Sequence, residues 1–220
     1  MVGLRERKRA QTRLSLVDAL IERLAERPLE EIQVRELAEA AQVSLATLFN
    51  YFPTKAAILT HFIQLWSLRM AARCRRLRAE CASPLSVVET LFVETAEETA
   101  AHPQVMLELI AHQARMPVDL VLAPVEPVER GLLLPEEEDV GDLPDGGLGA
   151  LLPGLLRDAI AAGELPLRAD LETLTLATAS VFFGVPLLVG RRDPGAIAPL
   201  YRAQLALLWA GAQQLGGSRR

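Results

Sequence analysis

The stretch VRELAEAAQVSLATLFNYFPTK, residues 34–55, decides the fold of this chain of 220 residues. Apolar residues recur at helical spacing over 34–40 and again over 44–51, and only the three residues 41–43 separate the two segments. Two short helices joined by so tight a turn form a helix-turn-helix if a small residue lies where they approach each other, and Ala38 stands at that point. We therefore expect this stretch to fold as a helix-turn-helix.

The residues around Ala38 fit the same interpretation. Leu37, Val43 and Leu48 place apolar side chains between the two helices, and Ser44 is a capping residue at the start of the second helix. A longer preceding helix supplies a third apolar wall, which is made by Val17, Ile21 and Leu24. The N-terminal part of the chain is thus expected to be a unit of three helices.

The remainder of the sequence predicts further helices and no sheet. Half of the residues are hydrophobic, and alternating β-branched runs are scarce. Helical spacing together with Ser, Pro and Gly at the ends predicts about nine helices, which cover approximately residues 5–26, 34–40, 44–51, 54–80, 83–102, 103–116, 148–162, 170–189 and 195–215. Residues 117–147 combine acidic side chains with many prolines and glycines, and we expect a long, partly mobile loop there.

Charge is distributed unevenly along the chain. The net charge is −5, yet residues 1–13 carry five basic side chains against one acidic, whereas residues 126–145 carry eight acidic side chains against one basic. A basic N-terminal arm is compatible with local contact to phosphates in spite of the negative total. The uncharged stretch 173–190 is long enough for a membrane span, but its hydroxyls, glycine and proline favour a buried helix or a dimer interface. We expect no contact with a membrane and a cytoplasmic location.

At this point the sequence resembles the TetR family of transcriptional regulators. The resemblance rests on Leu29-Glu30-Glu31-Ile32, on Leu37-Ala38, on Val43-Ser44 and above all on the run TLFNYFPTK at 47–55. It covers about residues 8–60, within the helices where the motif belongs. It implies an all-α fold with an N-terminal three-helix helix-turn-helix DNA-binding domain over 1–53. A helical ligand-binding and dimerisation domain would follow over 54–220.

Two residues depart from the family pattern. Gln42 stands in the turn where the family often has glycine, and a left-handed backbone there would cost a non-glycine residue roughly 1–2 kcal/mol. Gln33 stands where the family often has a threonine, and its longer side chain caps a helix poorly but could reach a phosphate.

The resemblance implies roles in DNA binding for individual residues. The second helix of the motif would enter the major groove, where Asn50 could read an adenine, while Tyr51 and Lys55 would contact phosphates. The basic arm would reach the backbone or the minor groove. The full expected set is Arg5, Arg7, Lys8, Arg9, Gln33, Ser44, Leu45, Ala46, Thr47, Phe49, Asn50, Tyr51 and Lys55.

The second domain is expected to bind a small, apolar ligand and a second copy of the chain. The candidate ligand contacts, each also a candidate core residue, are Phe62, Trp66, Phe92, Met106, Leu109, Ile110, Gln113 and Phe183. The candidate dimer contacts are Leu200, Leu207, Leu208 and Trp209. The family mechanism would make the protein a repressor that leaves a palindromic operator when the ligand binds.

Two alternatives remain open at the level of sequence. One is a ligand-free architectural DNA-binding protein of the same fold. The other is a helical enzyme that uses paired acids such as Glu94 and Glu98 with a metal. The three histidines His61, His102 and His112 do not have metal-ligand spacing, so we expect no metal site, no cofactor and no catalytic residue.

Overall fold

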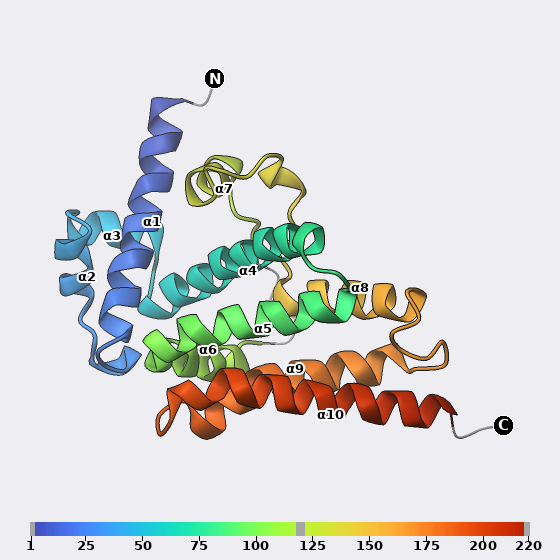
Figure 1. Cartoon of the computed structure of the whole chain (residues 1–220). Coiled ribbons are helices and arrows are strands. Elements are labelled where there is room, and N and C mark those ends of the chain that lie inside the picture. Colours follow the sequence, from blue (N-terminus) through green and yellow to red (C-terminus); the bar gives the residue numbers. More distant parts are fainter. Residues whose placement is uncertain (1–2, 118–121, 218–220) are drawn as a thin grey trace. The chain divides into compact units, whose positions relative to one another are not determined.

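The computed structural model describes residues 3–117 and 122–217. Within these residues the chain forms ten α-helices, three short 3-10 helices and no strand (Figure 1). The expected all-α fold class is confirmed. The chain divides into two compact units, of which unit 1 comprises Met1–Arg69 with Gln104–Asp145, and unit 2 comprises Met70–Pro103 with Gly146–Arg220. The proposed functional boundary at residue 53 is a different division and stays a prediction.

Unit 1 contains the N-terminal three-helix arrangement. Its elements are α1 (Leu4–Leu24), η1 (Leu29–Glu31), α2 (Val34–Ala40), α3 (Leu45–Tyr51), the first part of α4 (Lys55–Glu80), α6 (Pro103–Arg115), α7 (Pro127–Leu133) and η2 (Val140–Asp142). Leu20, Leu37 and Leu48 are completely buried between α1, α2 and α3. The helix ends follow the sequence signals: the Ser44 hydroxyl accepts a hydrogen bond from the Thr47 amide at 3.0 Å, and the Thr54 hydroxyl accepts one from the Ala57 amide at 3.0 Å.

The acidic segment over 117–147 is more ordered than the sequence predicted, although residues 118–121 lie outside the described residues. It contains the seven-residue helix α7, which begins with Pro127 at the position where a helix tolerates proline, and the turn η2. Helix α7 packs against α1, and its Glu129 is fully buried. The expectation of a loop without a helix was therefore wrong for this part of the segment.

Buried charges explain why this segment is ordered. The Glu129 carboxylate lies 2.6 Å from His61 Nε2 on α4 and 3.4 Å from Arg13 Nε on α1. Arg130 donates hydrogen bonds to the carbonyls of Val125 and Leu143 at 3.1 and 3.0 Å, and it pairs with Asp145 at 2.8 Å. Two ionic residues of the segment that was expected to be a loop, Glu129 and Arg130, are thus the ones that hold α7 in place.

Unit 2 is built around aromatic and aliphatic side chains. Its elements are the remainder of α4, α5 (Pro84–Ala101), α8 (Gly147–Ala161), α9 (Leu171–Val189), η3 (Pro194–Ala196) and α10 (Ile197–Gly217). The ring of Phe92 lies edge-on to Phe182 and Tyr201, with centroid distances of 4.9 and 5.1 Å. The Tyr201 hydroxyl donates a hydrogen bond to the Phe182 carbonyl at 2.7 Å, and burial raises the pKa of Tyr201.

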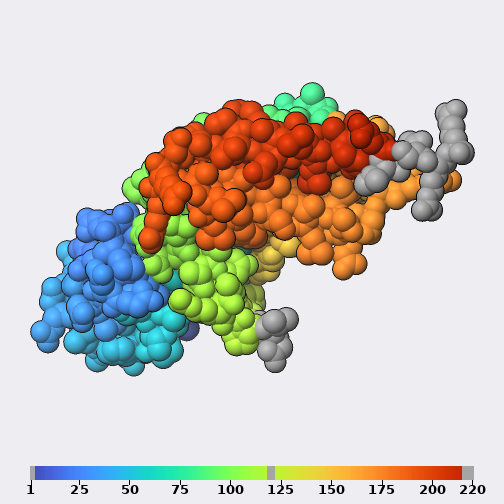
Figure 2. Space-filling view, turned by 90° about the horizontal axis from the view of Figure 1, so that it is seen from below, coloured from blue at the N-terminus to red at the C-terminus, as the bar shows by residue number. Residues whose placement is uncertain are grey.

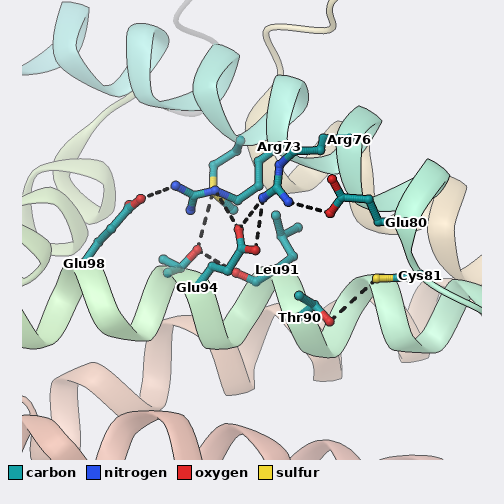
Figure 3. A network of polar contacts seen from close by, with 10 residues as sticks. Arg73, Arg76, Glu80, Cys81, Thr90, Leu91, Glu94 and Glu98 are labelled. Atoms are coloured by element: carbon teal, nitrogen blue, oxygen red, sulfur yellow. Dashed lines mark hydrogen bonds and ion pairs between the residues drawn. The ribbon is translucent and has the colours of Figure 1, made fainter.

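Ion pairs join the second part of α4 to α5 (Figure 3). Glu94 on α5 lies 3.2 Å from Arg73 Nε and 2.8 Å from Arg76 Nη2. Arg73 also pairs with Glu98, and Arg76 pairs with Glu80 at 2.7 Å. Glu94 and Glu98, the acids of the enzyme alternative, thus serve here as partners of arginines that hold two helices together. Groups of three or more His, Cys, Asp or Glu able to hold a metal do not occur among the described residues.

Candidate nucleic-acid interface

The helix-turn-helix forms as the sequence predicts. Helix α2 ends at Ala40, the chain turns over residues 41–43, Ser44 caps the next helix and α3 begins at Leu45. Leu48 is completely buried against the rest of unit 1, and this fixes the rotation of α3 about its axis. The opposite side of α3 is exposed and includes Leu45, Phe49 and Asn50; the Phe49 side chain is 49% exposed. An exposed phenylalanine next to an exposed asparagine suits contact with base edges in a major groove.

A hollow of about 660 Å³ in unit 1 brings the two halves of the expected site together. It is lined by one face of α1 and by the turn and α3 of the helix-turn-helix. Its residues are Arg5, Glu6, Lys8, Arg9, Thr12, Gln42, Val43, Ser44, Thr47 and Tyr51. The basic arm and the start of the recognition helix, far apart in sequence, therefore share one surface.

The charges of this hollow favour a polyanion. Three cationic side chains, those of Arg5, Lys8 and Arg9, line it together with the carboxylate of Glu6, and Arg9 also pairs with Glu126 at 3.4 Å. The Glu6 carboxylate accepts a hydrogen bond from the Gly3 amide at 3.1 Å, so it serves the first turn of α1. Six of the expected DNA contacts are exposed but do not line the hollow: Arg7, Gln33, Leu45, Ala46, Phe49 and Asn50.

Lys55 lies in an environment that the sequence did not reveal. Its ammonium donates hydrogen bonds to the carbonyls of Leu29, Glu30 and Ile32, at 2.7, 3.2 and 2.6 Å. An ammonium has three N–H donors, so these carbonyls occupy all of them. Lys55 thereby ties the start of α4 to η1, and direct contact with a phosphate remains a prediction for this residue.

Sequence reasoning left Thr12, Gln42 and Val43 out of the site, although they line the hollow. Thr12 could have been found from its place one helical turn after Lys8 and Arg9. Gln42 stood out only as an unusual turn residue, and its exposed side chain adds a polar group to the hollow.

The candidate ligand contacts fall in both units. In unit 1, Phe62, Met106 and Leu109 are buried, Trp66 and Ile110 are half-buried, and Gln113 is exposed. In unit 2, Phe92 is completely buried, and Phe183 is half-buried with its ring edge-on to Phe182 at 5.1 Å. Burial of this kind is what core residues and ligand-lining residues share, so the assignments remain predictions.

The candidate dimer contacts differ in exposure. Leu207 on α10 is 74% exposed, whereas Leu200 and Leu208 are half-buried. Trp209 is half-buried and packs against the cluster of Leu156, Ala159, Leu165 and Leu174 in its own unit. Helices α9 and α10 lie side by side along their length, as Figures 1 and 2 show in orange and red.

Helix α9 is the single helix among the described residues that is long and apolar enough to cross a membrane by length and composition. It packs against both α8 and α10 within unit 2. Core helices of soluble proteins pass the same test, so α9 is weak support for a membrane span.

Comparisons with known proteins agree with this geometry. Residues 16–62 match the family described as bacterial regulatory proteins, tetR family. The chain is similar to Thermus thermophilus FadR, a TetR-family repressor whose structure was determined in complex with lauroyl-CoA. The two chains are 26% identical, with a TM-score of 0.62, and the match covers 94% of this chain and 96% of that one. The chain shares its fold with Bacillus subtilis FadR in complex with stearoyl-CoA, at 19% identity and a TM-score of 0.62 over 90% of this chain and 98% of that one.

A third structure of the same fold is RolR in complex with resorcinol, at 15% identity and a TM-score of 0.60, covering 99% of this chain and 97% of that one. No curated protein matches the sequence significantly. The helix-turn-helix, the all-helical architecture and the family match lead to one conclusion: residues 16–62 form a domain of the tetR family of bacterial regulatory proteins, in a chain that shares the fold of TetR-family transcriptional regulators.

Proposed function

We propose that the protein is a homodimeric repressor that binds a palindromic DNA operator and releases it when a small apolar ligand binds. The observation that carries the DNA-binding part is the hollow in which Arg5, Lys8 and Arg9 meet the start of α3. Cations beside an exposed recognition helix provide both phosphate contacts and base contacts on one surface. Such a protein acts in the cytoplasm, where the DNA is.

The roles of the recognition residues follow from their exposure. Phe49 and Asn50 project from the outward side of α3, where Asn50 can pair with an adenine and Phe49 can contact a thymine methyl group. Tyr51 and the arm residues flank them in the hollow and are suited to the sugar-phosphate backbone. These contacts would set the register of the protein on DNA and the sequence that it selects.

The dimer would form through α9 and α10. Leu176 and Leu187 on α9 are 62% and 54% exposed, and they lie three helical turns apart on one side of the helix. On α10, Leu207 is surrounded by exposed alanines at 203, 206 and 210. A surface of leucine and alanine without charges is costly to leave in water, and a second copy of the same surface covers it symmetrically. Two recognition helices related by a two-fold axis require a palindromic operator.

The ligand proposal rests on the apolar character of the second domain and on its relatives. Two structures of the same fold hold lauroyl-CoA and stearoyl-CoA, and a third holds resorcinol. The candidate contacts of this chain are mainly aromatic and aliphatic, which favours an apolar or aromatic ligand. Helix α4 begins in unit 1 and continues into unit 2, so a ligand that prefers one orientation of α4 would alter the spacing of the recognition helices.

The test starts from the whole protein without assuming an operator. DNA that the wild-type protein enriches from a random duplex pool is footprinted, and its affinity is measured by gel shift with and without lauroyl-CoA, stearoyl-CoA or resorcinol. We expect a palindromic sequence with half-sites about 10 base pairs apart or a multiple of that spacing. We also expect one of the ligands, or a compound of its class, to weaken binding. Failure to enrich any sequence would overturn the DNA-binding proposal.

The ligand part has its own outcome. If a compound binds the protein by calorimetry and leaves the operator affinity unchanged, ligand and DNA are not coupled, because linkage requires a reciprocal effect. The protein would then be closer to the architectural alternative. The enzyme alternative has less support, because the acids that suggested it are partners of Arg73 and Arg76.

A further inference from the structure

The turn between α2 and α3 contains a backbone conformation that favours glycine. Gln42 has φ 56°, and within the described residues only Asp139 is another non-glycine residue with positive φ. The Gln42 amide donates to the Glu39 carbonyl at 3.0 Å, and the Val43 amide donates to the Ala38 carbonyl at 2.9 Å. This pair of hydrogen bonds is the Schellman cap of a helix end, which requires a left-handed residue at the position of Gln42.

The same chain builds the same cap elsewhere with glycine. At the end of α8, Gly163 has φ 78°. Its amide donates to the Ile160 carbonyl at 3.1 Å, and the Glu164 amide donates to the Ala159 carbonyl at 2.9 Å. The two caps are equivalent in their hydrogen bonds, so the cap itself needs no side chain. A residue that keeps a strained conformation where glycine would serve points to a use for its side chain.

The surroundings of Gln42 indicate what that use is. Its side chain is exposed and lines the hollow together with Arg5, Lys8 and Arg9. Within residues 3–117 and 122–217 its carboxamide has no hydrogen-bond partner. A carboxamide offers two N–H donors, and the three cations beside it attract a phosphate to which those donors can bind.

We propose that Gln42 is a DNA-contact residue whose carboxamide donates a hydrogen bond to a backbone phosphate seated in the hollow between α1 and α3. This inference rests on the proposed DNA-binding function and adds a contact to it. Because the Gln42 side chain is neutral, it would contribute to DNA affinity through the geometry of one hydrogen bond. Arg5 and Lys8 would contribute through their charge. At this left-handed position the Gln42 side chain is exposed and lines the hollow, where a phosphate could reach it.

Two substitutions separate the contact from the strain. Q42A removes the carboxamide and keeps a Cβ in the left-handed conformation, whereas Q42G removes both. We expect each to weaken binding to the enriched operator by about 3–10-fold, the range of one neutral hydrogen bond. Only Q42G should raise the Tm, by about 2–4 °C. G163A is the matched control, because it places strain in the equivalent cap of α8 and should lower the Tm without changing operator affinity.

Two further measurements identify the contact as a neutral one to phosphate. The slope of log affinity against log salt should stay unchanged in Q42A and Q42G, while K8A should reduce it by about one. When single phosphates of the operator are replaced by methylphosphonates, one replacement should weaken binding by the wild-type protein. The same replacement should not weaken binding by Q42G, because that variant already lacks the contact. Equal affinity of wild type and Q42G, or equal losses at every methylphosphonate, would overturn the inference. If the inference about Gln42 fails but the wild-type protein binds the operator, the proposed function still stands. Failure of the wild type to enrich any DNA would overturn both the proposed function and the inference about Gln42.

Discussion

The two compact units distribute charge and apolar surface in opposite ways. The buried ionisable residues with acidic, basic or imidazole side chains in the described part of the chain, His61, Glu129 and Arg130, all belong to unit 1. The buried polar residues of unit 2 are threonines such as Thr95 and Thr178, whose hydroxyls donate to carbonyls one turn back in their own helices. Unit 1 therefore depends on ion pairs inside its fold, while unit 2 depends on apolar packing.

The surfaces show the same contrast. Unit 1 exposes Phe49 among polar and basic residues, whereas unit 2 exposes Leu176, Leu188 and Leu207 on helices that carry few charges. An exposed apolar side chain by itself only indicates a missing partner. The charges around it indicate the chemistry of that partner, which under the proposed function is a polyanion for unit 1 and a second apolar face for unit 2. Each prediction below tests one side of this contrast.

The largest effect is expected at the apolar face of unit 2. Leu207→Glu places a carboxylate where two copies would pack. Because the dimer is two-fold symmetric, its interface would contain two such carboxylates. We expect a monomer by light scattering and a loss of operator affinity of more than about a hundredfold, since one half-site alone provides little affinity. Circular dichroism should show unchanged helix content.

Leu167→Glu is the matched control for this variant. Leu167 is 86% exposed, but it lies in the loop between α8 and α9, outside both helices of the proposed interface. This variant should remain a dimer with unchanged operator affinity. A monomeric wild type, or a dimeric Leu207→Glu protein, would remove the proposed interface and with it the contrast between the two surfaces.

The next effect concerns the buried charges of unit 1. Glu129→Ala leaves His61 and Arg13 without their carboxylate, and removing one partner of a buried pair costs about 3–5 kcal/mol of the free energy of unfolding. Because Arg13 is partly exposed, we expect the lower end of that range. Glu129→Gln, which keeps the shape and one acceptor, should cost less.

The two tryptophans make this measurement specific to one unit. Trp66 lies in unit 1 and Trp209 in unit 2, so a Trp209→Phe background reports on unit 1 by fluorescence during urea unfolding. Glu136→Ala, at an exposed acid of the same segment, serves as the control and should leave the midpoint unchanged. Equal midpoints for Glu129→Ala and Glu136→Ala would show that the ion pairs do not hold α7 in place.

A third prediction distinguishes the role of Lys55 from the role of Tyr51. Lys55→Ala takes the donor from three carbonyls, so we expect a loss of about 1–3 kcal/mol in the free energy of unfolding together with weaker operator binding. Tyr51→Phe removes only the hydroxyl of a residue that lines the hollow, and it should weaken operator binding about 3–10-fold at unchanged stability. If Lys55→Ala is as stable as wild type and still binds DNA poorly, direct phosphate contact is the better explanation of its role.

The sequence predicted the helix-turn-helix well because its determinants are local. The Ser44 cap, the small Ala38 and the buried Leu48 each act within a few residues of their place in the chain. Helix boundaries elsewhere followed from Pro and Gly in the same way, for example at Pro84, the first residue of α5.

What the sequence did not show involves long-range contacts. The carbonyls that bind Lys55 belong to the backbone, and a sequence does not show where backbone groups lie. Helix α7 was missed because prolines and glycines predict a loop, while its order depends on Glu129 meeting Arg13 and His61 from other helices. Trp209 packs partly on the core of its own unit, and its expected place in a dimer interface stays a prediction. Periodicity reveals that a face is apolar but not which surface it covers.

The smallest expected effect is a pH dependence confined to unit 1. His112 on α6 is half-buried, and its Nε2 lies 2.8 Å from the Thr60 hydroxyl on α4. Desolvation lowers the pKa of His112, and the nearby Arg115 lowers it further, although Glu108 opposes this. The folded state thus binds a proton less readily than the unfolded state, so the stabilising contribution is present above about pH 6.5 and is lost as the pH falls below it.

His112→Gln should remove this dependence, because glutamine can replace the hydrogen bond to Thr60 and does not titrate. Urea unfolding of the Trp209→Phe background at pH 7.5 and pH 5.5 should show a smaller loss of stability in the His112→Gln variant than in the parent. The two proteins differ only at position 112, so the difference between them reports on that side chain. Identical pH dependence would mean that His112 takes up its proton without cost, and that the charge sensitivity of unit 1 comes from its buried ion pairs alone.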